Sequence, residues 1–115
     1  MIDNYSISGS KIIFEAGRIA EFDFLIKKAM TFNHYIIVLL DIPSRSSYNQ
    51  NVFAINYKGR ILWQIDGLEI HSLTPCCPFI SIEIRNRELV CLNACGFRFT
   101  VNPATGKVTS QVFTK

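Results

Sequence analysis

The feature that most constrains the fold is a hairpin pattern that occurs twice. Residues 51–65, NVFAINYKGRILWQI, are two stretches of alternating apolar residues separated by Tyr57-Lys58-Gly59. The motif Phe-x-Ile/Val-Asn, a turn and then Gly-Arg/Lys-Ile/Val returns in residues 99–108, offset by 46 residues before the turn and 47 after it. Alternation with period two is typical of half-buried strands, and a repeat of this length predicts a second sheet built like the first.

We therefore expect one all-β domain over residues 1–115, with two antiparallel four-stranded sheets and little helix. The repeats cover residues 21–66 and 79–113, with strands expected near 21–26, 35–41, 51–56, 60–66, 79–85, 88–93, 97–102 and 107–113. Residues 5–8 and 11–15 predict two short strands joined by Gly9-Ser10. The apolar run in residues 35–40 predicts a strand covered on both faces, and residues 26–30 predict at most one helical turn.

The pattern also predicts how the hairpins pack. In each hairpin we expect the Phe-x-Ile/Val face and the Ile/Val that follows the glycine to point the same way. Trp63 would share that face with Ile61 and Ile65 and fill the space between two twisted sheets. The two sheets would pack face to face and bury each other, completed by the N-terminal strands, so that no closed ring is needed.

These hairpins resemble the outer hairpins of quinoprotein-type β-propeller blades. Residues 51–65 and 96–115, with a weaker match over 22–43, resemble more closely a class of small bacterial all-β proteins. Proteins of this class include or resemble immunity proteins of interbacterial toxin systems, such as contact-dependent growth inhibition. The resemblance implies two blade-like sheets in a partial propeller or sandwich-like arrangement. It also implies a protein that binds a cognate toxin and blocks its active site.

Charge and hydropathy patterning narrow the function classes. The formal net charge is +3, and the longest basic run is Lys27-Lys28, so we expect no nucleic-acid partner. The longest apolar stretch, residues 35–40, is too short to span a membrane. The opening residues MIDNYSISGS lack the basic start and apolar run of a signal peptide, which predicts a cytoplasmic protein.

The four cysteines are Cys76, Cys77, Cys91 and Cys95. Four thiolates could hold zinc, but structural zinc sites use pairs spaced by two to four residues on two knuckles, and adjacent cysteines splay apart. A disulfide between Cys76 or Cys77 and Cys91 is geometrically conceivable but unexpected in a reducing compartment. We expect the cysteines to act as small apolar packing residues and expect no metal site.

No catalytic set stands out. His34 and His71 belong to no recognisable motif, and Cys77 with His71 is the closest approach to a nucleophile and base. The carboxylates are scattered over different segments, and the six glycines form no phosphate-binding loop. We therefore predict that the protein is not an enzyme and needs no cofactor.

A protein-binding inhibitor would use loops and one sheet edge. The predicted partner-binding residues are Arg45, Tyr48, Asn49 and Gln50 in the polar loop after Pro43, and Asp66, Glu69 and His71 after the first repeated hairpin. The alternative is a small-ligand binding module with a pocket between the sheets, lined by Phe, Tyr and Trp63. A metal-dependent enzyme is a third possibility, which metal analysis would test.

Overall fold

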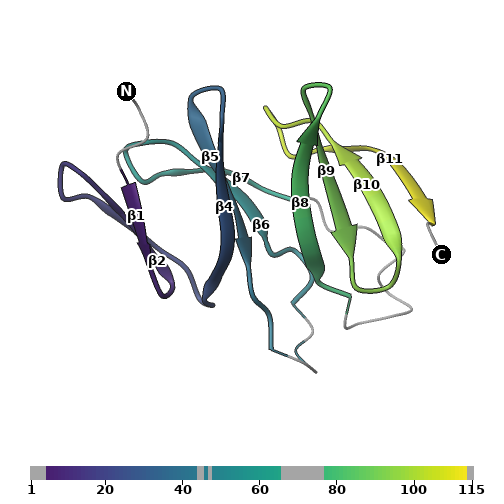
Figure 1. The fold of residues 1–115 in the computed structure, drawn as a ribbon, viewed down its shortest axis with the longest axis horizontal. Coiled ribbons are helices and arrows are strands. Elements are labelled where there is room, and N and C mark those ends of the chain that lie inside the picture. Colours follow the sequence, from purple (N-terminus) through teal and green to yellow (C-terminus); the bar gives the residue numbers. More distant parts are fainter. Residues whose placement is uncertain (1–4, 44–45, 47, 66–76, 114–115) are drawn as a thin grey trace.

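The fold is built from strands in the part of the chain that the structure describes. The computed structural model describes residues 5–43, 46, 48–65 and 77–113. Within these residues there is no helix, and so none that could cross a membrane, and the prediction of an all-β chain is confirmed (Figure 1). The strands are β1 (Tyr5–Ser8), β2 (Lys11–Phe14), β3 (Ile19–Glu21), β4 (Ile26–Phe32), β5 (Tyr35–Leu40), β6 (Val52–Ile55), β7 (Ile61–Gln64), β8 (Phe79–Arg85), β9 (Glu88–Asn93), β10 (Phe97–Val101) and β11 (Val108–Phe113).

These strands form three antiparallel sheets, where two were predicted. The first sheet has the strand order β1-β2-β3, the middle sheet β4-β5-β6-β7 and the last sheet β11-β10-β9-β8. The sheets follow one another along the molecule in sequence order (Figure 1). The predicted number was wrong because residues 5–21 pair with one another and form a sheet of their own.

Strand β4 corrects the prediction for residues 21–32. Residues 21–24 predict a strand and residues 26–30 a helical turn, but β3 ends at Glu21 and β4 runs over the supposed helical turn. β4 pairs with β5, with Met30 opposite Ile37 and Phe32 opposite Tyr35. The buried strand β5 offers backbone groups that need partners, and this requirement outweighs the local preference of a short segment.

The sheets stack in a head-to-tail manner, because the middle sheet is apolar on both faces. One core lies between the first and middle sheets and contains Ile12, Phe14, Ala20, Phe22, Ile36, Val38, Leu40, Phe53 and Ile55. The other lies between the middle and last sheets and contains Ile37, Leu39, Val52, Ala54, Trp63, Ile65, Phe79, Ile82, Leu89, Cys91, Phe99 and Val101. Phe53 therefore faces the sheet before its own, and so does Phe99. The predicted face-to-face packing of the two repeats is wrong in this respect.

A β-bulge separates Trp63 from the Phe53 face. Ile55 pairs with Ile61 and Ala54 with Trp63, so Leu62 is an extra residue in β7. The bulge turns Trp63 and Ile65 toward the last sheet, while Phe53 and Ile55 face the first sheet. Trp63 and Ile65 share a face, as expected, and Ile61 pairs with Ile55. The expectation that Trp63 also shares the face of Ile61 is wrong, and Ile61 is exposed. The last sheet has a matching irregularity between Thr100 and Val101.

The outer face of the last sheet is more polar than the corresponding face of the middle sheet. In the middle sheet this face carries the paired row Met30, Ile37, Ala54 and Trp63. The corresponding row of the last sheet is Glu83, Val90, Thr100 and Ser110. Arg85 and Glu83 form an ion pair at 2.6 Å on the same face. A polar outer face of this kind ends a stack of sheets in water.

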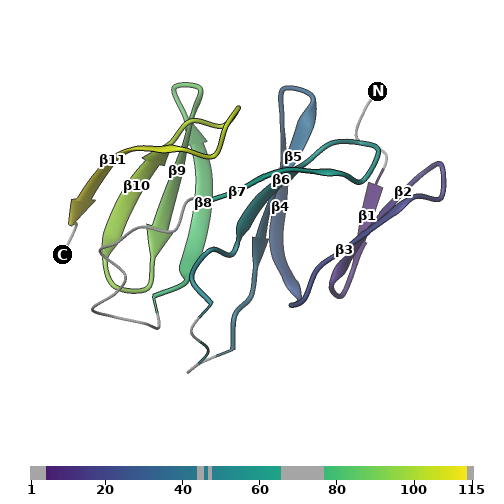
Figure 2. The ribbon, with the colours of Figure 1, turned by 180° about the vertical axis from the view of Figure 1, so that it is seen from behind.

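The turns between the last two strands of the middle and last sheets reach across to the preceding sheet (Figure 2). Tyr57 in the β6–β7 turn packs its ring edge-on against Phe14, with ring centroids 6.0 Å apart. In the β10–β11 turn, the carbonyl oxygen of Pro103 accepts a hydrogen bond from Trp63 Nε1 at 2.8 Å. Each turn is thus held by an aromatic side chain, which fixes its position.

Candidate binding cleft

Three hairpin turns from two sheets meet at one end of the molecule and form a cleft. The turns are β4–β5 of the middle sheet and β8–β9 and β10–β11 of the last sheet, and Figure 1 shows them at the same end. The cleft has a volume of about 780 Å³ and is lined by Thr31, Phe32, Asn33, Tyr35, Arg87, Asn102, Pro103 and Ala104. Head-to-tail stacking creates this site, because it places turns of neighbouring sheets beside each other.

Two of the turns hold non-glycine residues in the left-handed region. Asn33 in the β4–β5 turn has φ 56°, and Asn86 and Arg87 in the β8–β9 turn have φ 50° and 67°. Two successive positive φ angles define a type I′ hairpin turn, for which Asn-Gly is the preferred sequence. An arginine in place of this glycine costs about 1–2 kcal/mol of backbone strain. Backbone strain of this kind is concentrated at active sites and ligand-binding segments in proteins.

The third turn is held in place by its own side chains and by the middle sheet. Asn102 Oδ1 accepts a hydrogen bond from the Ala104 backbone N–H at 2.9 Å, and Thr105 Oγ1 accepts one from Lys107 N at 3.3 Å. The Trp63 indole anchors the carbonyl of Pro103. This wall of the cleft is therefore ordered before any ligand arrives, which lowers the entropy cost of binding.

The lining offers hydrogen-bond donors and one positive charge. The Tyr35 hydroxyl is buried and has no hydrogen-bond partner among the described residues, and its ring meets Phe32 edge-on at 6.0 Å. Burial raises the pKa of Tyr35, and the nearby Asn33 side chain opposes this effect without forming a hydrogen bond of standard geometry. Arg87 is exposed and forms no ion pair with a described carboxylate. The described lining contains no acidic residue, so the cleft is suited to an acceptor or an anion.

A second hollow brings together two carboxylates that are far apart in the sequence. Asp23 and Asp41 line a pocket of about 510 Å³ with Ser10, Phe24, Leu25 and Pro43. The hydrogen bond from Asp41 N to the Leu25 carbonyl at 2.8 Å fixes this arrangement. No histidine or cysteine lines the pocket, and no described group of three or more His, Cys, Asp or Glu could hold a metal ion. The described lining thus combines the Ser10 hydroxyl with two carboxylates, and no histidine accompanies them.

Residues 2–113 match the family described as a domain of unknown function, DUF7957. The chain belongs to this family. No curated protein matches it. The match covers all three sheets, so the stack of sheets and the cleft between their turns lie within the DUF7957 domain.

The described members of the predicted binding set hold their own loop in place. Gln64 Nε2 donates hydrogen bonds to the Tyr48 hydroxyl at 3.0 Å and to the Gln50 carbonyl at 2.8 Å. Gln50 Nε2 donates in turn to the carbonyl of Ile65, and Asn49 Oδ1 accepts from Cys77 N at 2.9 Å. Burial raises the pKa of Tyr48. Arg45, Asp66, Glu69 and His71 lie outside the described residues. His34, by contrast, is exposed on the β4–β5 turn beside the cleft.

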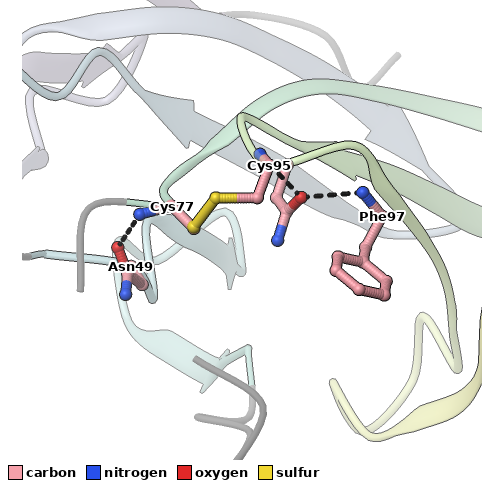
Figure 3. Close-up of a disulfide and its surroundings, with 5 residues drawn as sticks. Asn49, Cys77, Cys95 and Phe97 are labelled. Atoms are coloured by element: carbon pink, nitrogen blue, oxygen red, sulfur yellow. Dashed lines mark hydrogen bonds between the residues drawn. A yellow bond between two sulfur atoms is a disulfide. The ribbon is translucent and has the colours of Figure 1, made fainter. Parts of the chain in front are cut away.

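The expectation of four reduced packing cysteines is wrong for two of them. Cys77 and Cys95 form a disulfide that joins the start of β8 to the β9–β10 turn (Figure 3). Asn93 Oδ1 accepts hydrogen bonds from Cys95 N at 3.1 Å and Phe97 N at 2.9 Å, which shapes this turn. Cys91 is free and buried, as a packing residue should be, and burial raises its pKa to about 12. Cys76 lies outside the described residues.

The lining residues of the cleft were missed at the sequence level, although the strands expected over residues 79–85, 88–93, 97–102 and 107–113 imply two of its three turns. The β4–β5 turn was not predicted. Asn86-Arg87 and Asn102-Pro103 carry clear turn signals. The missing information was which turns lie next to each other, and this depends on the stacking direction of the sheets. One signal was available, since Arg at a position that favours glycine in a two-residue hairpin turn is unusual.

Proposed function

We propose that this chain is a non-catalytic binding protein that recognises a partner protein through the cleft between its hairpin turns. The observation that carries the proposal is the combination of two side chains in one preordered cleft. Arg87 lies in a strained turn and forms no ion pair with a described carboxylate, and the buried Tyr35 hydroxyl has no hydrogen-bond partner among the described residues. Buried donors without partners cost free energy, and a ligand that supplies an acceptor recovers it.

The partner that we propose is a bacterial toxin domain, in keeping with the resemblance to immunity proteins. An acceptor-bearing segment of the toxin would enter the cleft, and the chain would thereby cover the active site of the toxin. Support comes from rigid hairpin turns on a β scaffold, an arrangement that other binding proteins use for recognition. The blade-like stacking of the sheets, a partial propeller in our interpretation, supplies the scaffold.

A cytoplasmic location belongs to the same proposal, because an immunity protein meets its toxin inside the producing cell. The Cys77–Cys95 disulfide sets a condition for a cytoplasmic location, since thiols are usually reduced in the cytoplasm. The fold should therefore persist when the disulfide is reduced.

The test is a binding measurement with the polypeptide encoded by the adjacent reading frame. We expect the wild-type chain to bind it at micromolar or lower concentration in calorimetry. Arg87→Ala should weaken binding about tenfold or more, and Tyr35→Phe should weaken it by a smaller factor. Arg18→Ala is the matched control, because Arg18 is an exposed arginine in a turn of the first sheet.

Two outcomes would count against the proposal. If the wild-type chain does not bind the polypeptide, the toxin partner is wrong. If Arg87→Ala and Arg18→Ala bind equally well, the cleft is not the recognition site.

Small-ligand binding is the second candidate function, and the Tyr35 hydroxyl beside Phe32 favours it. The ligand would occupy the cleft between the hairpin turns. It would not lie between the sheets, because that space is filled by buried side chains, among them Trp63. A thermal-shift screen with carboxylate-bearing metabolites would support this candidate if the stabilisation were lost in Tyr35→Phe. A flat response would count against it.

A further inference from the structure

The first sheet contains a third copy of the turn motif that defines the repeat. The three copies are Gly17-Arg18-Ile19, Gly59-Arg60-Ile61 and Gly106-Lys107-Val108. The glycine φ angles are 92°, 83° and 77°. The residue after each glycine accepts a backbone hydrogen bond in the same way: from Phe14 to Arg18 at 2.8 Å, from Asn56 to Arg60 at 3.0 Å and from Asn102 to Lys107 at 2.8 Å. The β2–β3 hairpin therefore corresponds to the last hairpin of each four-stranded sheet.

This alignment makes β1 the counterpart of β5. Ile7 lies opposite Ile12 in the first sheet, as Ile37 lies opposite Ala54 in the middle sheet. Ile12 and Ala54 are both buried on the face toward the following sheet. The same alignment places Tyr5 at the position of Tyr35.

Among the described residues, no strand of the first sheet corresponds to β4, and an apolar residue of β1 is exposed. In the middle sheet Met30 of β4 flanks Ile37, which is 0% exposed. In the first sheet no described strand pairs with the outer edge of β1, and Ile7 is 45% exposed. By its register Ile7 lies on the same face as the buried Ile12, but no described strand flanks it on the outer side.

We propose that the outer edge of β1 binds an extended segment of a partner protein, which adds a fourth strand to the first sheet. The segment runs antiparallel to β1, as β4 runs to β5, and carries an apolar residue opposite Ile7 in the place of Met30. Backbone hydrogen bonds supply affinity in this mode, and the side chain beside Ile7 supplies specificity. The identity of the partner rests on the proposed function.

The size of the edge favours a partner protein over a second copy of this chain. Four residues of strand span roughly 13 Å. Two such strands paired in a homodimer would bury far less surface than the roughly 1,200–2,000 Å² of a stable specific interface. The β1 edge is thus one part of a larger interface, as expected for a partner that also contacts other surfaces.

The first test grafts the missing strand and needs no partner. In the full chain, residues 1–4 are replaced by IKKAMTFNH, the chain's own residues 26–34, so that the methionine falls opposite Ile7. The control is the same graft with serine in place of that methionine. The graft should slow amide exchange of residues 5–8 about tenfold or more and raise Tm by about 5 °C, and the control should do much less. Unchanged exchange and Tm in the graft would overturn the proposal.

The second test separates this edge from the cleft. Ile7→Lys should weaken binding of the adjacent-frame polypeptide about tenfold, because a charge at the edge opposes strand addition. Ile19→Lys is the control, since Ile19 is 53% exposed on the outer face of the same sheet. Wild-type binding by Ile7→Lys would overturn docking at β1 and leave the cleft intact. A stabilising graft without partner binding by the wild type would instead overturn the proposed function while supporting strand addition.

Discussion

The Trp63 indole and the backbone of Gly106 lie in contact across the boundary between the middle and last sheets. A β-carbon placed on Gly106 would be 2.6 Å from both Cδ2 and Cε3 of the Trp63 ring. Only glycine fits this approach, and the φ of 77° also favours glycine. The contact positions the β10–β11 turn, which forms one wall of the cleft.

Gly106→Ala should therefore destabilise the protein more than a glycine substitution in an open turn. We expect a loss of about 3 kcal/mol or more, from overpacking against Trp63 together with left-handed strain. Gly17→Ala is the matched control, because Gly17 has φ 92° but nothing within 4 Å of an added β-carbon. That variant should lose only about 1–2 kcal/mol of strain. Equal losses in urea unfolding would contradict the contact.

Asn51 joins the middle sheet to the last sheet from a fully buried position. Its Nδ2 donates to the carbonyls of Leu40 and Phe79, both at 2.9 Å, and its Oδ1 accepts from Phe79 N at 2.8 Å. Asn51→Ala leaves these buried groups without partners and should cost about 3 kcal/mol or more of unfolding free energy. Asn56→Ala, which removes hydrogen bonds to the exposed turn, should cost about 1 kcal/mol. The reverse order in denaturant unfolding would refute this role of Asn51.

The disulfide should stabilise the fold without being essential to it. Cys77 and Cys95 are separated by 18 residues. Closing a loop of this size lowers the entropy of the unfolded chain by an amount worth about 3 kcal/mol. We expect dithiothreitol to lower the unfolding free energy by up to that amount and to leave the circular dichroism of the folded state unchanged. The Cys77→Ser/Cys95→Ser variant should not respond to dithiothreitol, and an unresponsive wild type would show that the disulfide is absent.

Cys91 gives the stability a defined pH dependence. Burial raises its pKa from 9.0 to about 12, so the folded protein keeps the thiol proton over a range in which the unfolded chain loses it. The unfolding free energy should therefore fall as pH rises above 9, with a slope approaching about 1.4 kcal/mol per pH unit. Between pH 9 and 10 this slope should be absent in Cys91→Val. Above pH 10 the raised pKa values of Tyr35 and Tyr48 act in the same direction.

The sequence pattern predicted the elements better than their arrangement. Period-two alternation located most strands, and the apolar run of residues 35–40 forms a strand that is buried on both faces, as expected. Strand β4 was not predicted, because its hydrogen-bond ladder with β5 determines its structure more than the preferences of its own residues do. The face of Trp63 was predicted wrongly because a single extra residue, Leu62, reverses the side of the sheet on which it lies.

The cleft and the disulfide could not be predicted from the sequence, for a related reason. Arg87, Tyr35 and Asn102 come from turns of two sheets, and their proximity depends on which face of each sheet is buried. Cys77 and Cys95 meet because Asn49 and Asn93 hold the two chain segments, through hydrogen bonds that leave no periodic signal. Residue types indicated the two turns of the last sheet but not the β4–β5 turn, and the proximity of the three turns depends on the three-dimensional stacking.

The most direct test of the account is to measure proton–proton contacts among the phenylalanine rings by NMR. Head-to-tail stacking predicts a contact between Phe53 of the middle sheet and Phe22 after β3, whose centroids lie 5.2 Å apart. The contact between Phe99 and Phe79, at 5.3 Å, lies within the last sheet and serves as an internal reference. The stacking predicts no contact between Phe53 and Phe99, which face different neighbouring sheets. Contacts between Phe53 and Phe99 would mean that the two repeats pack face to face. The turns that form the cleft would then no longer meet, and the proposed binding site would be lost.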